Sequence, residues 1–331
     1  MKTICSLRWH DDLEEARAAA RRNRRPILSL RLLGRLDEEQ SCANSRFFRT
    51  TLYPSRVVRT LLAERFVLHW RSVRPVPRVT IDFGDGRRLE RTLTGNSAHL
   101  VLDDRGRPVD ALPGLYDANR FARLASAAAD LATDTVAADG GARRARLASW
   151  HGARRDALLR AWSRDLRAAG TRLAGAATPE ALAVATGDAE WSRIALLHAG
   201  SALPDAAVRD AITRSLEPLP PAGAPGPDAH EAGRLAPTKR AVEQPLLDVL
   251  LPLARTIAED SARNEYDLHR RVHERFSGAS AVTEDADELA AWVYAALFKM
   301  PPADPWLGLR AAAFAGGAWP STASTADPRP A

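Results

Sequence analysis

The sequence predicts an α/β domain followed by an all-α domain. Within residues 1–138, short apolar runs bounded by Pro and Gly alternate with amphipathic helical patterns, which is typical of strands and helices that share one sheet. From residue 142 to 310 the sequence is rich in Ala and Leu at helical spacing and carries no strand signal. Gly140 and Gly141 separate the two regions. At 331 residues, the chain is long enough for two domains of about 150 residues each.

The first elements of the α/β region are a helix and a buried strand. The pattern from Trp9 to Asn23 predicts a helix, in which Asp11 and Glu14 have the spacing of a capping box. Pro26 ends that helix, because proline cannot donate the backbone hydrogen bond that would continue it. The apolar run 26–33 then predicts a strand buried on both faces.

The rest of the α/β region contains the remaining elements of a sheet. Apolar residues at helical spacing predict helical structure over 47–62, and the run 66–70 predicts a second strand. Alternating segments around Gly-containing turns predict one β-hairpin over 78–93 and another over 98–112. A closing helix is expected over 117–138, capped by the aspartate at its start.

Helical periodicity dominates the second region. We expect helices over the ranges 142–169, 179–200, 205–216, 240–276 and 285–299.

Proline divides this region and marks its linkers. Residues 217–237 form a Pro/Gly-rich linker, and Pro245 and Pro252 are expected to kink or break the fourth helix. The segment 293–309 is predicted to be a hydrophobic strap against the core; the alternative is one wall of a binding cleft between the two regions. The tail 321–331 is small, polar and Pro-containing, which predicts disorder.

Composition excludes several classes of protein. Hydrophobic residues make up 45% and charged residues 27%, so neither wholesale disorder nor a membrane bundle is expected. No apolar run of about eighteen residues occurs, and acidic residues near the start replace the apolar stretch of a signal peptide. We therefore expect a cytoplasmic protein with no membrane partner. Its two cysteines, Cys5 and Cys42, are too few for a disulfide framework or a zinc ribbon.

The charge balance does not favour nucleic-acid binding. The net charge is only +6, the arginines are spread through Ala-rich helical stretches, and aromatic residues make up just 6%. Solvated helix faces explain such a pattern, so nucleic acid is not expected as a partner. The sequence does not specify an oligomeric state.

Residues 9–125 resemble the thioredoxin-like superfamily. Trp9, an acidic Ala-rich helix, the Arg-Pro-apolar strand at Pro26 and the Phe66-Val67 strand start follow the order seen in members of these families. The resemblance implies a thioredoxin-like fold for the α/β domain.

The same resemblance places Cys42 and Ser97 at two key positions. Cys42-Ala-Asn-Ser45 falls where these families have Cys-x-x-Cys, so Cys42 aligns with the nucleophile and Ser45 replaces the resolving cysteine. Ser97 stands at the cis-proline position, within Gly95-Asn96-Ser97. Because a dithiol enzyme needs its second cysteine to resolve the mixed disulfide, this chain cannot complete that cycle internally.

Two functions follow from this resemblance. The first is a monothiol redox protein, with thiol–disulfide oxidoreductase or thiol-peroxidase-like activity on protein thiols or disulfides and no cofactor. Cys42 would be its nucleophile, Ser45 would donate a hydrogen bond to the thiolate, and the backbone of Asn96 and Ser97 would pair with a substrate strand. The alternative is a non-catalytic binding or assembly module with a cleft between its two halves, in which Cys42 is a small residue at a helix start.

A second candidate site lies in the helical region. Glu265, His269 and His273 recur at intervals of four, which places them on one face of a helix. Two imidazoles at this spacing with a carboxylate can bind zinc or another divalent ion. The alternative is a hydrogen-bonded polar face packed against another part of the chain.

Overall fold

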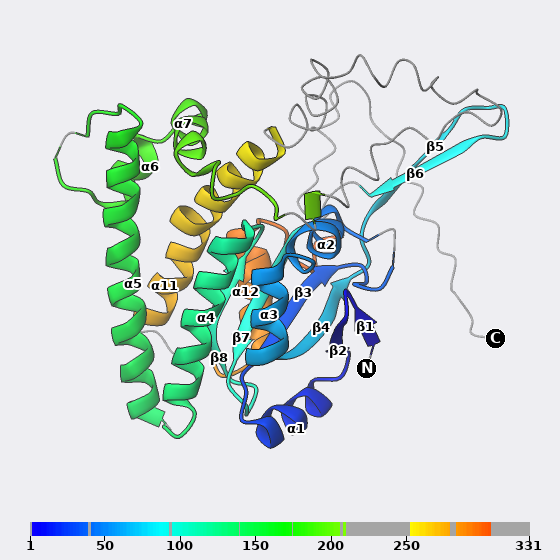
Figure 1. Cartoon of the computed structure of the whole chain (residues 1–331), viewed down its shortest axis with the longest axis horizontal. Helices are drawn as coiled ribbons and strands as arrows, with labels where there is room; N and C mark the ends of the chain where they lie inside the picture. The colour runs from blue at the N-terminus through cyan, green and yellow to red at the C-terminus, as the bar shows by residue number, and fades with distance from the viewer. Residues whose placement is uncertain are drawn as a thin grey trace, which may run out of the picture.

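A six-stranded mixed sheet forms the centre of the computed structural model (Figure 1). The structure describes residues 2–38, 41–92, 95–138, 140–173, 175–205, 208–209, 252–278 and 283–305. The sheet has the order β1-β2-β4-β3-β7-β8. Its strands are β1 (Lys2–Ile4), β2 (Leu7–His10), β3 (Ile27–Leu33), β4 (Val67–Arg74), β7 (Ser97–Leu102) and β8 (Pro108–Pro113). The prediction of an α/β region followed by a helical one is confirmed.

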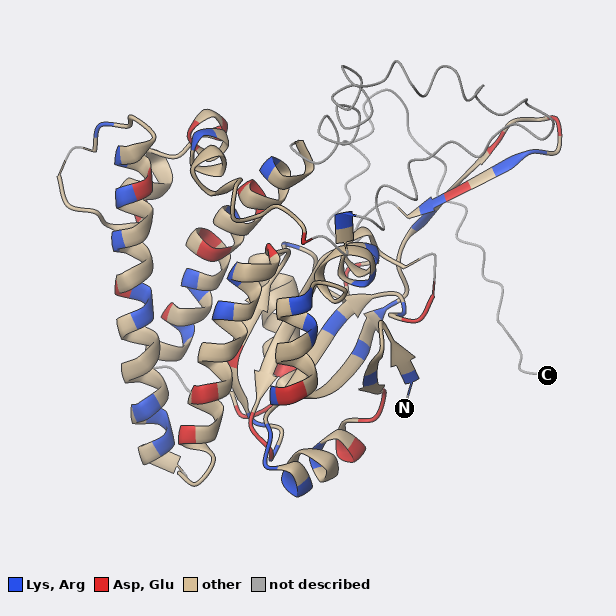
Figure 2. Ribbon diagram, viewed as in Figure 1, with Lys and Arg blue, Asp and Glu red and all other residues tan. Residues whose placement is uncertain are grey.

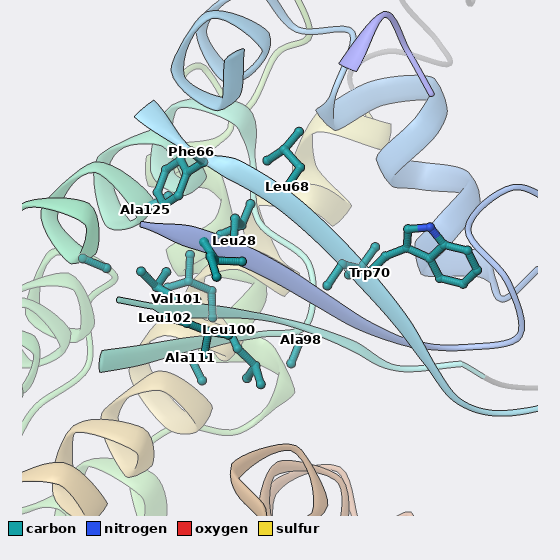
Figure 3. Packing of buried hydrophobic residues seen from close by; sticks show 14 of the residues in the cluster. Leu28, Phe66, Leu68, Trp70, Ala98, Leu100, Val101, Leu102, Ala111 and Ala125 are labelled. Carbon is teal, nitrogen blue, oxygen red and sulfur yellow. The ribbon is translucent and has the colours of Figure 1, made fainter. Parts of the chain in front are cut away.

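Strand β3 is the hydrophobic centre of the sheet. It pairs in parallel with β4 and antiparallel with β7, so that Leu28 lies opposite Leu68 on one side and Val101 on the other. All seven residues of β3 are buried, which explains why its sequence is an apolar run without alternation. Figure 3 shows these three side chains within the packed core.

The outer strands complete the topology. β2 pairs in parallel with β4, and β7 and β8 form an antiparallel hairpin. β1, which the sequence analysis missed, adds antiparallel to β2 through a tight turn at Cys5 and Ser6, whose φ angles are 52° and 62°. Polar residues with positive φ in so short a segment give no periodic signal.

Helix α1 (Leu13–Asn23) begins later than the predicted start at Trp9, because Trp9 belongs to strand β2, which the sequence pattern did not reveal. Its N-cap is Asp12, whose carboxylate accepts a hydrogen bond from the Glu15 backbone N–H at 2.8 Å, so the assignment of the cap to Asp11 was wrong. Both aspartates have the right chemistry, and backbone geometry selects the second.

Two adjoining helices, α3 and α4, pack against each other beside the sheet. The chain after β3 forms α2 (Ala43–Phe47), a π-helical turn η1 (Phe48–Leu52) and α3 (Arg56–Arg65). Helix α4 (Ala118–Thr135) is capped by Asp117, as predicted, through a 2.8 Å hydrogen bond from the Arg120 backbone N–H.

The predicted hairpin over 78–93 is confirmed as a separate two-stranded sheet of β5 (Arg78–Asp82) and β6 (Arg88–Thr92). Its turn uses Gly84 and Gly86 at φ of 77° and 91°, values that favour glycine. The hairpin projects away from the main sheet (Figure 1) and carries interspersed acidic and basic residues (Figure 2).

The helical region lies along one side of the sheet. Its described elements are α5 (Gly140–Ala168), α6 (Pro179–Val184), α7 (Asp188–His198), a helix over 252–263, the π-helical turn η2 (Asn264–His269), α11 (Arg270–Ser277), α12 (Ala286–Trp292) and the π-helical turn η3 (Val293–Leu297). None of the described helices has both the length and the apolar character needed to cross a membrane.

One prediction for this region needs correction. The helix expected over 179–200 is two helices, because the Glu190 carboxylate accepts from the Gly187 N–H at 3.1 Å and caps a new start there. Pro252 lies at the first described position of the helix over 252–263, and the residues before it lie outside the described ranges, so the break expected there stays a prediction.

Other predictions lie outside the described residues. These are most of the helix over 205–216, the linker 217–237, Pro245 with the start of the fourth helix, the end of the strap beyond residue 305, and the tail 321–331.

A single hydrophobic core joins the sheet to part of the helical region. Leu147 of α5, Val272 of α11 and Tyr294 of η3 belong to the same buried cluster as Leu28 of β3. The start of the predicted strap also joins it, since Met300 is buried in that cluster. Burying apolar surface from both regions together stabilises their contact.

Candidate functional site

Cys42 lies at the start of α2 but is fully buried. It occupies the N-cap position of this five-residue helix, and its side chain makes no capping hydrogen bond. Its exposed fraction is 0%, and its sulfur lies 3.6 Å from the hydroxyl oxygen of Ser97. The fold therefore brings Cys42 beside the segment that the resemblance aligned with the cis-proline, without presenting the sulfur to solvent.

The loop before β7 packs directly onto Cys42. A Cβ atom built on Gly95 would lie 2.0 Å from the Cys42 Cβ, closer than any real contact. Only a residue without a side chain fits there.

The end of the helical region covers the same loop from outside. The Tyr294 hydroxyl donates to the backbone oxygens of Asn96 at 2.7 Å and Arg31 at 3.3 Å. The Asn96 side-chain amide in turn lies 3.4 Å from the Met300 sulfur. Burial raises the pKa of Tyr294 well above its ordinary value, and the nearby Cys42 adds to that rise. Tyr294 and Met300 therefore form a cover, supplied by this chain, over the Cys42 site.

Ser45 does not have the predicted role. Its hydroxyl is buried and has no hydrogen-bond partner among the described residues, so it does not donate to Cys42. The hydroxyl near the sulfur is that of Ser97. Ser45 is the third residue of α2.

The backbone of Asn96 and Ser97 is already engaged within the chain, which contradicts its predicted availability to a substrate strand. The Asn96 carbonyl accepts from Tyr294, and Ser97 pairs with Leu32 in the sheet. The Ser97 carbonyl accepts from the Gly114 N–H at 2.8 Å. Strand addition at this position requires the cover to move first.

The second cysteine does not form a disulfide. Cys5 and Cys42 are both free thiols. The Cys5 thiol donates to the Arg49 carbonyl at 3.2 Å, and burial raises its pKa, partly offset by the Arg49 charge. A raised pKa lowers the thiolate fraction at neutral pH, so Cys5 is a weak nucleophile.

The metal set predicted from sequence is only partly brought together. Glu265 does not face the histidines, because its carboxylate pairs with Arg120 at 3.0 Å and Arg123 at 2.8 Å. The physical reason is charge pairing with these two arginines of α4, a contact between distant segments that the spacing of residues along one helix does not reveal. Glu265 was therefore wrongly included.

His269 and His273 instead join two residues that the sequence analysis missed. His269 Nε2 lies 3.0 Å from an Asp110 carboxylate oxygen, and His273 Nδ1 lies 2.7 Å from His151 Nδ1. Asp110 is on β8 and His151 is on α5. We call these four buried residues the Asp–His cluster. An aspartate inside an otherwise apolar strand is the sequence signal that would have identified Asp110.

Ionisation in the Asp–His cluster follows from burial and local charge. Burial lowers the pKa of His151 to about 4 and that of His273 well below its ordinary value, so both rings are neutral at neutral pH. Burial alone would raise the pKa of Asp110, but the interactions with His269 and His151 and the hydrogen bond from the Ala111 N–H together lower it. His151 and His273 thus present neutral imidazoles beside a carboxylate, the ionisation states that bind metals.

Comparison with protein-family models, curated proteins and solved structures finds no match to this chain.

Proposed function

We propose that this chain is a thioredoxin-like protein that acts as a non-catalytic binding or assembly module, in which Cys42 is a packing residue. The observation that carries the proposal is the complete burial of Cys42 beneath the loop at Gly95 and the cover at Tyr294. A thiol exchanges disulfides only when its sulfur can approach the substrate sulfur, so a buried thiol is inert in this state.

The chain order supports the thioredoxin-like part of the proposal. β2, α1, β3, a helical segment, β4, the β7–β8 hairpin and α4 follow one another as expected of that fold. The two parallel pairs next to β4 and the antiparallel pairing of β3, β7 and β8 agree with the same order.

A cleft between the two regions supports the binding part. A space of about 420 Å³ lies where α3 and the start of α4 face residues 203–205. Val57 and Leu203 line it and are exposed by 42% and 39%, and Asn119 adds a polar group at its edge. Exposed apolar side chains with a few polar neighbours are typical of surfaces that bind a partner.

Turnover assays test this proposal. We expect the wild-type chain to reduce a glutathionylated peptide, with glutathione as the resolving thiol, no faster than the Cys42→Ala variant, and to consume hydrogen peroxide no faster either. The Cys5→Ala variant is the matched control for the other thiol. The Cys42→Ala variant should also keep the cellular role of the protein. Turnover that depends on Cys42 would overturn the proposal.

One observation favours the monothiol redox protein as a second candidate. The Ser97 hydroxyl, 3.6 Å from the Cys42 sulfur, is within reach to donate a hydrogen bond to a thiolate. In that reaction the Cys42 thiolate attacks one sulfur of a substrate disulfide, and the other sulfur leaves as a thiolate. An external thiol then attacks the substrate sulfur of the mixed disulfide and releases Cys42. This function requires displacement of the cover, and Cys42-dependent turnover in the assays above would identify it.

A further inference from the structure

The Asp–His cluster brings metal-binding side chains from distant parts of the chain to one point. One ligand atom each from Asp110, His151 and His273 lies within 4.8 Å of the other two, and all three residues are buried. They come from β8, α5 and α11, so the point lies where the sheet meets the helical region (Figure 1). From this geometry we infer that the cluster binds one divalent first-row metal ion, with zinc as the matching ion.

The ring of His151 is oriented as a ligand. Its Nε2 lies 2.9 Å from the Val109 carbonyl oxygen, which can only accept, so Nε2 carries the proton. In a neutral ring the lone pair is then on Nδ1, the atom that faces His273. A histidine that binds a metal usually donates its other N–H to a carbonyl or carboxylate in this way.

The contact between His151 and His273 can exchange a shared proton for a cation if the two rings move apart. Their Nδ1 atoms lie 2.7 Å apart, so without a metal the proton of His273 must bridge the two nitrogens. A metal ion bound to both lone pairs replaces this bridging proton, which moves to the other ring nitrogen of His273. Two nitrogens bound to one tetrahedral zinc ion lie about 3.3 Å apart, so the contact widens on binding.

Asp110 supplies the negative charge that a buried cation needs. His269 holds its carboxylate with Nε2 at 3.0 and 3.1 Å from the two oxygens, and the Ala111 N–H donates to the same group at 2.8 Å. His269 is thus a positioning residue. Its Nδ1 is buried and has no hydrogen-bond partner among the described residues, so the cluster is not a closed hydrogen-bond network.

The donor set selects the class of metal. Imidazole nitrogens suit zinc and its first-row neighbours, whereas magnesium and calcium prefer sites made of oxygen. The cluster offers three ligands, so a tetrahedral ion would take a fourth such as water, and the burial of all three residues leaves that position closed to a substrate. Such an ion would join β8 to α5 and α11. This inference does not depend on the chemistry of Cys42.

Zinc titration of the whole chain tests the inference. The wild-type protein is unfolded in urea with a chelator, refolded without metal, and titrated with zinc by calorimetry. We expect about one ion per chain with a Kd below roughly 1 µM, together with a higher melting temperature. Binding no tighter than about 1 mM would overturn the inference.

Substitution of the proposed ligands distinguishes zinc binding at this site from adventitious zinc binding elsewhere on the chain. His151→Gln and His273→Gln should each weaken zinc binding by at least about 100-fold, because each removes a ligand. His198→Gln is the matched control, since His198 is partly exposed and lies outside the cluster. Zinc binding that is unchanged in both cluster variants would overturn the inference.

The visible absorption spectrum of bound cobalt(II) tests the site in the wild-type chain, so it remains informative if those variants fail to fold. Cobalt(II) bound to the wild-type chain should give the visible absorption of a tetrahedral nitrogen and oxygen site. The spectrum of hydrated cobalt alone would contradict the assignment.

Discussion

Gly95 determines how closely the loop before β7 can approach Cys42. The missing side chain lets the loop backbone lie where a Cβ would be 2.0 Å from the Cys42 Cβ and 3.2 Å from its Cα. The near neighbours are a backbone atom and the first side-chain atom, so neither can rotate away. The tight closure of the Cys42 site therefore depends on this glycine.

Gly95→Ala should destabilise the protein by about 2 kcal/mol or more, because the added methyl group forces the loop and α2 apart. Urea unfolding followed by tryptophan fluorescence measures the change. Gly141→Ala is the matched control: no atom lies within 4 Å of the Cβ it would add, so it should not destabilise α5. Equal effects of the two substitutions would contradict the packing described for Cys42.

Two buried histidines make the fold sensitive to acid. Burial lowers the pKa of His99 to about 3, and burial together with the charges of Arg31 and Arg71 lowers that of His69 to about 3. His99 accepts or donates one hydrogen bond with Tyr53 at 2.8 Å, and His69 does so with Ser29 at 2.8 Å. Both rings are neutral in the folded state at pH values where the unfolded chain binds protons.

Between pH 6.5 and about 3, the unfolded state therefore binds more protons than the folded state. The free energy of unfolding should fall as the pH drops through this window, by up to about 1.4 kcal/mol per pH unit for each histidine. Urea titrations at pH 7, 6, 5 and 4 measure the slope. His69→Leu should make it shallower, and a flat profile in the wild-type chain would contradict the burial of these rings.

At the scale of elements, local sequence signals were sufficient to predict most strands of the sheet. The apolar run of β3, the Gly-containing turns of the β5–β6 and β7–β8 hairpins, and the Asp117 cap of α4 all depend on neighbours within a few residues. Their energetics are short-range, so the pattern of residue types identifies them.

Elements that depend on unusual backbone geometry were predicted less well. The turn at Cys5 and Ser6 that creates β1 and the π-helical turn η2 have no periodic signal. The partner of Glu265 was missed for a different reason, because its carboxylate pairs with Arg120 of α4, which lies far away in the sequence.

The candidate sites could not be predicted from local patterns, because they depend on contacts between segments that are distant in the sequence. The sequence correctly placed Cys42 at a helix start, but the loop that packs on Cys42 is held by Tyr294, more than 200 residues away. Likewise, Asp110 and His151 meet His273 only because β8, α5 and α11 pack together. Single-sequence patterns carry no information about such contacts.

At the scale of the whole molecule, the helical region contributes side chains to two sites of the α/β region. Tyr294 and Met300 cover the Cys42 site, and α5, η2 and α11 supply the histidines around Asp110. Both places share the hydrophobic core of the sheet. Separation of the regions would expose this core, so the cover over Cys42 is part of the folded state.

The accessibility of Cys42 tests this account most directly. In a Cys5→Ser chain, Cys42 is the only thiol, and its reaction with a maleimide can be followed in the native protein and in urea. We expect the native thiol to react at least about 100-fold more slowly than the unfolded one, because labelling requires opening of the cover. A native rate equal to that of a free thiol would contradict the account and support a reactive Cys42.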